Sequence, residues 1–169
     1  MSKHLVYVGI GSNIEAEKYI RLAIKYLHHS FGPHCDLQLS PVYKTQAIGF
    51  DGNDFFNLVA SFMTELSALE VALKLKEIEQ QNGRCHNQEK FSARTLDIDL
   101  LLYDQAIIND GNISIPRDEI EKYAFVLSPL ADLAPDLIHP VSGQNMAQMW
   151  LQLKNKAHAG SLQRITFNW

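Results

Sequence analysis

The chain has 169 residues, of which 46% are hydrophobic and 20% charged, and its formal net charge is −4 at pH 7. This composition predicts a globular protein with a hydrophobic core and excludes a disordered chain. Nonspecific binding of nucleic acid requires a basic face, so the negative charge argues against it. A small anionic substrate held by a few local arginines remains compatible. We expect one domain over residues 1–169.

Targeting and redox features point to one compartment. The N-terminal sequence MSKHLVYVGIGSN lacks the long apolar core and the cleavage site of a signal peptide. No apolar run approaches the ~20 residues that cross a bilayer. The two cysteines, Cys35 and Cys85, lie far apart without CxxC spacing, which argues against a disulfide framework. We expect a cytoplasmic monomer that does not bind membranes.

The first part of the chain predicts a strand followed by a helix. Residues 5–10 are apolar, and Gly11-Ser12-Asn13 follows them. We interpret Gly9 and Gly11 as a tight turn between strand and helix, and Asn13 as the N-cap of the helix. Apolar residues at helical spacing then continue until Gly32-Pro33.

The middle of the chain predicts two strands and a second helix. The two strands and the glycine- and aspartate-rich loop between them cover residues 37–45, 56–63 and 47–54, respectively. Ser67 and Glu70 form a capping-box pattern, which begins a helix that reaches about Asn82. Gly83 suits the position just after that helix.

The most informative stretch begins at Gly83 and reads GRCHNQEKFSARTLDIDLLLY. Its second half predicts a buried strand in which Asp97 and Asp99 point to the same face. Two neighbouring carboxylates repel each other, so we expect Mg²⁺ or arginines between them. Such a pair can also be a solvated edge or a salt-bridged pair. Together with Arg84 and Arg94, however, it favours a metal site for phosphoryl-type transfer to or from a nucleotide.

The order of elements predicts a ferredoxin-like α+β sandwich with a βαββαβ core. In that fold the first and fourth strands can pair, and we expect that the strand with the two aspartates is not forced to the edge. The rest of the chain is expected to form an extension. It comprises a hairpin, a helical stretch and a last amphipathic helix, over residues 107–115, 116–135 and 144–154.

Short motifs that together are typical of one protein family are spread over nearly the whole chain. They are Gly11-Ser12-Asn13, Ser40–Thr45, Phe56-Asn57, Gly83-Arg84, Arg94–Asp99, Ile115-Pro116, Phe125–Leu127 and Pro129-Leu130. In this combination the chain resembles the 6-hydroxymethyl-7,8-dihydropterin pyrophosphokinase family of folate biosynthesis. The resemblance implies a ferredoxin-like fold. It also implies transfer of the pyrophosphoryl group of ATP to the pterin hydroxymethyl oxygen, with release of AMP.

The resemblance also implies an active site, with ATP as co-substrate and two Mg²⁺ ions on Asp97 and Asp99. The catalytic residues would be these two aspartates together with Arg84 and Arg94, and Asp97 is a candidate acceptor for the hydroxyl proton. The residues implied for the pterin are Thr45, Ala47, Ile48, Phe55, Asn57 and Phe125. Those implied for ATP are Glu79, Arg84, His86, Arg94, Leu100, Ser114 and Arg117.

The chain departs from the family pattern on the loop and nucleotide side. His86 and Tyr123 stand where arginines are usual, and Ala93 stands where proline is usual. Phe91 replaces a common tryptophan, and Arg117 replaces a usual histidine. The expected ATP and loop surface therefore loses two positive charges and regains one.

Two alternatives stay open at this point. The first is a catalytically weak paralogue that binds pterin or nucleotide, which the changes at His86 and Tyr123 suggest. The second is a metal-dependent nucleotidyl transferase of the polymerase-palm type, which would use the same fold and paired aspartates. The acidic balance and small size of the chain count against a polymeric template.

Overall fold

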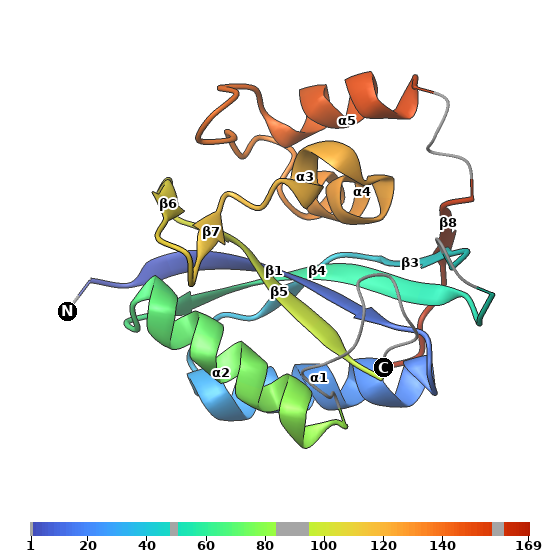
Figure 1. Ribbon diagram of the computed structural model, residues 1–169, viewed down its shortest axis with the longest axis horizontal. Coiled ribbons are helices and arrows are strands. Elements are labelled where there is room, and N and C mark those ends of the chain that lie inside the picture. Colours follow the sequence, from blue (N-terminus) through green and yellow to red (C-terminus); the bar gives the residue numbers. More distant parts are fainter. Residues whose placement is uncertain (1, 48–50, 84–94, 157–160) are drawn as a thin grey trace.

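A six-stranded sheet forms the centre of the computed structural model (Figure 1). Its strands are β1 (His4–Ser12), β2 (Gln38–Leu39), β3 (Val42–Thr45), β4 (Phe55–Thr64), β5 (Asp97–Tyr103) and β8 (Gln163–Ile165). Their order is β5-β1-β4-β3-β8, and β2 also pairs with β4. The structure describes residues 2–47, 51–83, 95–156 and 161–169.

Helices cover both faces of the sheet (Figure 1). One face carries α1 (Ala16–Phe31) and α2 (Ala68–Gln81), while the other carries α3 (Glu119–Lys122), α4 (Ala124–Leu133) and α5 (Met146–Lys154). The antiparallel order β5-β1-β4-β3 with α1 and α2 on one face confirms the predicted ferredoxin-like core. The pairing of β1 with β5 was predicted as well.

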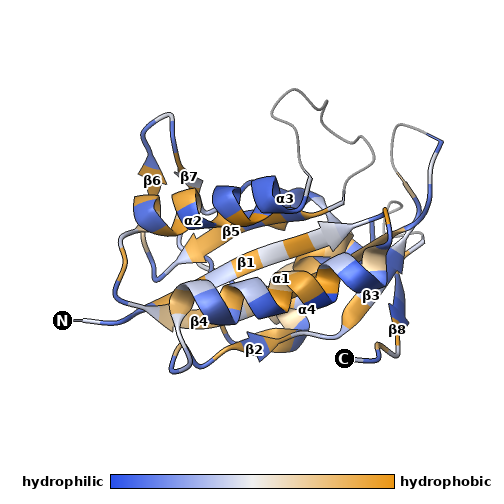
Figure 2. Ribbon diagram, turned by 90° about the horizontal axis from the view of Figure 1, so that it is seen from below, coloured by the Kyte–Doolittle hydropathy of each residue, from blue (hydrophilic) through white to orange (hydrophobic). Residues whose placement is uncertain are grey.

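Two hydrophobic clusters lie on opposite sides of the sheet because strand side chains alternate. Val6, Val8 and Ile10 of β1 pack beneath α1 and α2, whereas Tyr7 packs with α4. Figure 2 shows the strands rich in hydrophobic residues, between helices that also carry hydrophilic ones. Within the described part of the chain, no helix is both long and apolar enough to cross a membrane.

Several local predictions are confirmed. Helix α2 begins with a complete capping box, in which Ser67 and Glu70 bond each other's backbone N–H groups. Gly83 follows the helix with a positive φ of 87°, a conformation that glycine adopts readily. The predicted hairpin forms from β6 (Ile108–Asn109) and β7 (Ser114–Ile115).

Two predictions about the first strand and helix are wrong. Gly9 and Gly11 form no turn, because β1 extends through both to Ser12. Asn13 is not the N-cap of α1, since the helix begins at Ala16 after Glu15, which has a left-handed backbone. The Asn13 side chain instead donates to the backbone carbonyl of Asn53.

Four further differences concern strands and helices elsewhere in the chain. The single strand predicted over residues 37–45 is split by Ser40-Pro41 into β2 and β3, because proline cannot donate a ladder hydrogen bond. The helical stretch predicted from residue 116 is two helices that meet at Tyr123. β5 ends the strand order, so the strand with the two aspartates is at an edge. β8 was not predicted.

Candidate active site

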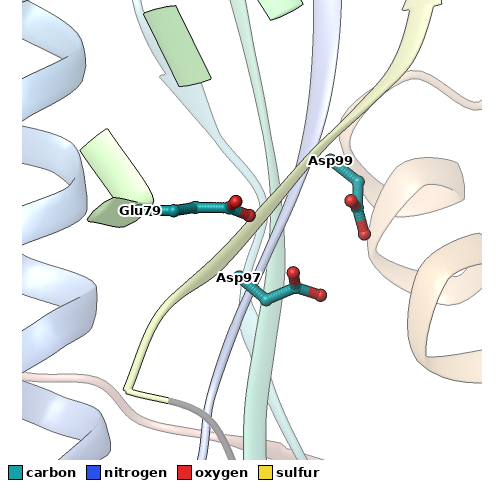
Figure 3. Close-up of side chains that lie close together, drawn as sticks. All are labelled: Glu79, Asp97 and Asp99. Carbon is teal, nitrogen blue, oxygen red and sulfur yellow. The ribbon is translucent and has the colours of Figure 1, made fainter. Parts of the chain in front are cut away.

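Asp97 and Asp99 lie on the same face of β5, as predicted. Ile98 and Leu100 pack into the core beneath α1 and α2, so the alternating aspartates project toward the opposite face. Figure 3 shows both side chains pointing away from α2. Both residues are half-buried, because they belong to an edge strand. Half-exposed carboxylates of this kind can exchange water for a ligand.

A third carboxylate, Glu79, completes a cluster with the two aspartates. Glu79 extends from the last turn of α2, is 6% exposed, and accepts a 2.7 Å hydrogen bond from the Ile98 N–H. One carboxylate oxygen from each of Glu79, Asp97 and Asp99 lies within 4.8 Å of the others (Figure 3). We call these three residues the carboxylate cluster.

The carboxylate cluster has the donor chemistry of a divalent-cation site. Oxygen ligands from two or three carboxylates suit Mg²⁺, which keeps other positions for water and phosphate oxygens. The sequence resemblance implied Glu79 only for ATP, and its place beside the aspartates was missed. A signal was present, because Glu79 follows Leu75 by four residues and therefore occupies a core-facing helical position.

Arg117 is a basic residue that lies next to the carboxylate cluster. Its Nε and Nη2 atoms donate to the two carboxylate oxygens of Glu119 at 3.0 and 2.8 Å, and its Nη2 lies 4.0 Å from Asp99 Oδ1. Burial acts to lower the pKa of Arg117, but attraction to Asp99 and Glu119 outweighs it and raises the pKa above its ordinary value. The guanidinium therefore stays charged.

A pocket of about 220 Å³ opens beside the cluster, between α2, β5 and β7. Its walls combine apolar side chains with polar groups at the rim. Asp99 lines this pocket. So do four residues that were predicted to bind ATP, namely Glu79, Leu100, Ser114 and Arg117. The structure thus brings these residues to one cavity, beside the candidate metal ligands.

Asn57 shares a row of the sheet with Asp97. Tyr43 pairs with Asn57, Asn57 with Gly11, and Gly11 with Asp97, so the row crosses four neighbouring strands. A Cβ atom on Gly11 would lie 2.8 Å from Asn57 Oδ1. Because Gly11 has no side chain, the Asn57 amide can lie over it. Neighbouring strands lie about 4.8 Å apart, so Asn57 and Asp97 are separated by about 10 Å across the glycine.

The other described residues predicted to bind the pterin come from the same region. Thr45 is paired with Phe55, and its hydroxyl accepts a long 3.5 Å hydrogen bond from the Asn57 amide. Ala47 is half-buried just after β3. Phe125 lies in the first turn of α4, which packs against β3 and β4. These residues therefore surround one end of the sheet.

Tyr123, which replaces a usual arginine of the resembled family, stacks on Phe125. The two ring centroids are 5.1 Å apart and the rings are inclined by 14°. Offset stacking of this kind favours a fixed orientation of both rings. The predicted loss of a positive charge at this position is therefore accompanied by a gain of an aromatic contact, which sequence reasoning did not anticipate.

Four predicted site residues, Ile48, Arg84, His86 and Arg94, lie outside the described residues. The described residues that flank the longer stretch are joined, since the Thr95 hydroxyl donates to the Asn82 carbonyl at 2.6 Å. In the sequence, Arg84 follows Asn82 by two residues and Arg94 directly precedes Thr95.

A comparison with protein families gives one match over most of the chain. A family model described as 7,8-dihydro-6-hydroxymethylpterin-pyrophosphokinase matches residues 7–135. A 2-amino-4-hydroxy-6-hydroxymethyldihydropteridine pyrophosphokinase of Aquifex aeolicus is 35% identical over 138 residues, which cover 80% of this chain and 84% of the relative. The protein of the same name from Pseudomonas aeruginosa is 35% identical over 147 residues, covering 85% and 88%.

Longer proteins match as well. The folic acid synthesis protein fol1 of Schizosaccharomyces pombe is 32% identical over 146 residues, which are 85% of this chain and 20% of that protein. Plasmodium falciparum HPPK-DHPS, solved with pteroate, has a TM-score of 0.72 at 13% identity and covers 97% of this chain. The chain spans 46% of that solved chain. At this identity the structural likeness establishes the fold alone.

Proposed function

Because this chain belongs to the 7,8-dihydro-6-hydroxymethylpterin-pyrophosphokinase family, we propose that it transfers the pyrophosphoryl group of ATP to 6-hydroxymethyl-7,8-dihydropterin. The reaction would be a step of folate biosynthesis, with AMP as the second product. One observation carries the proposal at the level of the site. Glu79 and Asp99 of the carboxylate cluster line the pocket of about 220 Å³, while Asp97 shares a strand row with Asn57.

Metal binding is assigned to the carboxylate cluster. Asp97 and Asp99 would hold two Mg²⁺ ions, and Glu79 supports them from α2 while it fixes the edge of β5 through Ile98. When bound, Mg²⁺ would neutralise the charge of the triphosphate. The three carboxylates fit this role because they converge within 4.8 Å and offer only oxygen ligands.

The nucleotide is assigned to the pocket beside the cluster. Leu100 offers an apolar wall for the base, Ser114 offers a hydroxyl, and Arg117 faces the phosphate side near Asp99. Arg84 and Arg94 would contact phosphates from beyond the junction of Asn82 and Thr95. Base, phosphates and metal ligands would then occupy neighbouring parts of one site.

The pterin is assigned to the region around Asn57. The Asn57 amide would hydrogen-bond the edge of the ring system, and Phe55 and Phe125 would stack on its faces. Thr45 supports the orientation of the amide. The separation of about 10 Å between Asn57 and Asp97 suits a bicyclic ring whose hydroxymethyl arm points toward the metal ligands.

In the reaction, the hydroxymethyl oxygen attacks the β-phosphorus of ATP and forms a new O–P bond. The bond from the β-phosphorus to the oxygen that bridges it to the α-phosphorus breaks, and AMP leaves with that electron pair. The hydroxyl proton passes to the Asp97 carboxylate. Such chemistry depends mainly on alignment and charge stabilisation, which the residues above supply.

The domain organisation and setting belong to the same proposal. We assign residues 1–169 to one domain, because α5 packs on α4 and β8 pairs with β3 although both lie beyond the end of the family match. We also propose, as expected from the sequence, that the protein is a monomer and is cytoplasmic.

The test is AMP release from ATP and Mg²⁺, with and without 6-hydroxymethyl-7,8-dihydropterin. We expect pterin-dependent AMP from the natural chain and at least a hundredfold lower rate from Asp97→Asn, because the substitution removes a metal ligand. Glu77→Gln is a matched control, since Glu77 is exposed on the same helix as Glu79. It should retain the natural rate.

The alternative is a paralogue that binds the pterin without catalysis. The replacement of two usual arginines by His86 and Tyr123 favours it. This alternative predicts calorimetric binding of the pterin without any pterin-dependent AMP. That outcome would refute the pyrophosphokinase activity and direct attention to these two positions. Absence of both pterin binding and AMP would also refute the assignment of the pterin to the region around Asn57.

A further inference from the structure

Glu119 holds Arg117 at a defined position beside the carboxylate cluster. Two guanidinium nitrogens of Arg117 donate to the two carboxylate oxygens of Glu119, a two-point contact with distances of 2.8 and 3.0 Å. The Glu119 side chain is 17% exposed and that of Arg117 is 34% exposed, so the pair is partly shielded from water. The Arg117 backbone N–H also donates to the Leu101 carbonyl of β5.

The same contact keeps Arg117 from bonding Asp99. The Arg117 Nη2 lies 4.0 Å from Asp99 Oδ1, which is beyond hydrogen-bond distance. A guanidinium beside three carboxylates would otherwise form a short, charge-assisted bond to one of them. Such a bond would occupy an oxygen that a metal ion needs. Glu119 therefore competes with Asp99 for Arg117.

The remaining donors of Arg117 are left for a ligand. A guanidinium has five N–H donors in a fixed plane, and Glu119 engages two of its nitrogens. Arg117 and Asp99 line the same pocket, so donors not used by Glu119 are available to an anion that enters there. Phosphate oxygens match the geometry of a guanidinium well.

We propose that Glu119 is a positioning residue for both the metal and the nucleotide. It holds Arg117 at 4.0 Å from Asp99, so that the guanidinium does not compete with a divalent cation for that carboxylate, and it presents the guanidinium to a phosphate of the nucleotide. This inference rests on the proposed function, since it takes the carboxylate cluster as the metal site. It adds to that function a residue for which neither the sequence motifs nor the family resemblance gave a role.

The test is a double-mutant cycle that measures Mn²⁺ affinity by calorimetry in the absence of nucleotide. The four proteins are the natural chain, Glu119→Gln, Arg117→Ala and the double variant. We expect Glu119→Gln to weaken Mn²⁺ binding about tenfold when Arg117 is present, because the released guanidinium bonds Asp99. In the Arg117→Ala background the same substitution should change the affinity less than twofold.

This design separates positioning from simple charge. Loss of a negative charge near the site would weaken Mn²⁺ binding in both backgrounds, and equal effects would overturn the proposal. Glu121→Gln is the matched control, because Glu121 lies on the same helix and faces His139 instead. It should leave Mn²⁺ affinity unchanged, and thermal unfolding of each variant verifies that it is folded.

A second readout concerns the nucleotide. Glu119→Gln should raise the KM for ATP at saturating Mg²⁺ by about tenfold while kcat falls less, and Glu119→Asp should recover part of the loss. A failure of Mn²⁺ to bind the natural chain would refute the metal site and this inference together. Binding to the natural chain with no difference on Glu119→Gln would refute the inference alone.

Discussion

At the scale of single residues, the pterin side of the proposed site depends on a missing side chain. Gly11 stands in β1 between Asn57 and Asp97, and the Asn57 amide leans over it. Any other residue would place a Cβ atom in that space. The glycine is therefore required by a neighbour in an adjacent strand rather than by the backbone conformation of a turn.

Gly11→Ala should raise the KM for the pterin at least tenfold, because its Cβ would lie 2.8 Å from Asn57 Oδ1 and displace the amide. Gly9→Ala is the matched control. Its Cβ would meet Leu101 at an ordinary 3.5 Å, on the same face of the same strand. Steady-state kinetics and thermal unfolding of both variants check this. Equal KM values for the two would contradict the assigned role of Asn57.

Two residues that depart from the family pattern show why sequence motifs alone describe the site incompletely. Tyr123 was expected to remove a positive charge, and its ring in fact stacks on Phe125. Arg117 was expected to restore a charge, and its guanidinium is held by Glu119 near Asp99. A residue type can be read from the sequence, but its neighbours depend on the fold.

At the scale of elements, the turn between α4 and α5 contains a buried titratable group. His139 is 2% exposed, and its Nδ1 accepts the backbone N–H groups of Val141 and Ser142 at 3.2 and 3.1 Å. Its Nε2 lies 3.6 Å from Glu121 of α3. Nδ1 can accept these bonds only in the neutral imidazole.

This turn should make stability depend on pH. Burial lowers the pKa of His139, and attraction to Glu121 offsets only part of the effect. The unfolded chain therefore binds the proton first, so the stabilisation is complete above the ordinary pKa of about 6.5 and decreases as pH falls toward the lower folded pKa. The unfolding temperature should drop by a few degrees between pH 8 and pH 5.

His139→Asn provides the comparison, because the asparagine carbonyl can accept the same N–H groups without titrating. Thermal unfolding at a series of pH values should show a shallower dependence for this variant below pH 6.5. All other residues are the same in the two proteins, so their contributions cancel in the difference. An identical dependence in the two proteins would rule out His139 as the source.

At the scale of the whole molecule, the C-terminal segment adds the edge strand β8 to the sheet. β8 pairs with β3 through Val42, Tyr43 and Lys44, and the Arg21 guanidinium of α1 donates to the Asn168 carbonyl. Phe167 packs against the core beneath α1 and α2. The last residues thus connect the edge of the sheet to the first helix.

A chain that ends at Ser161 should be less stable and more prone to self-association. Removing β8 exposes the N–H and C=O groups of β3, which another chain can then pair with. We expect the unfolding temperature to fall by about 5 °C, as for a loss of roughly 1–2 kcal/mol in a domain of this size. A chain that ends at Asn168 retains β8 and is the control. If the shortened chain had the same unfolding temperature and the same light scattering as the control, β8 would not protect the edge of β3.

By itself, the sequence determined the ferredoxin-like core, the capping box of α2, the hairpin and the two aspartates on one face of β5. These features follow from local signals, namely the period of apolar residues, the capping residues and the alternation of strand side chains. It also determined the family, because the motifs that carry the resemblance are short and contiguous.

Only the tertiary structure decided which of these parts meet. It brought Glu79 from α2 to the aspartates of β5, placed Gly11 beneath Asn57, and set Arg117 between Glu119 and Asp99. It also added β8 to a sheet whose edge the sequence left open. Each of these contacts joins residues from different elements, and their geometry comes from packing rather than from local sequence pattern.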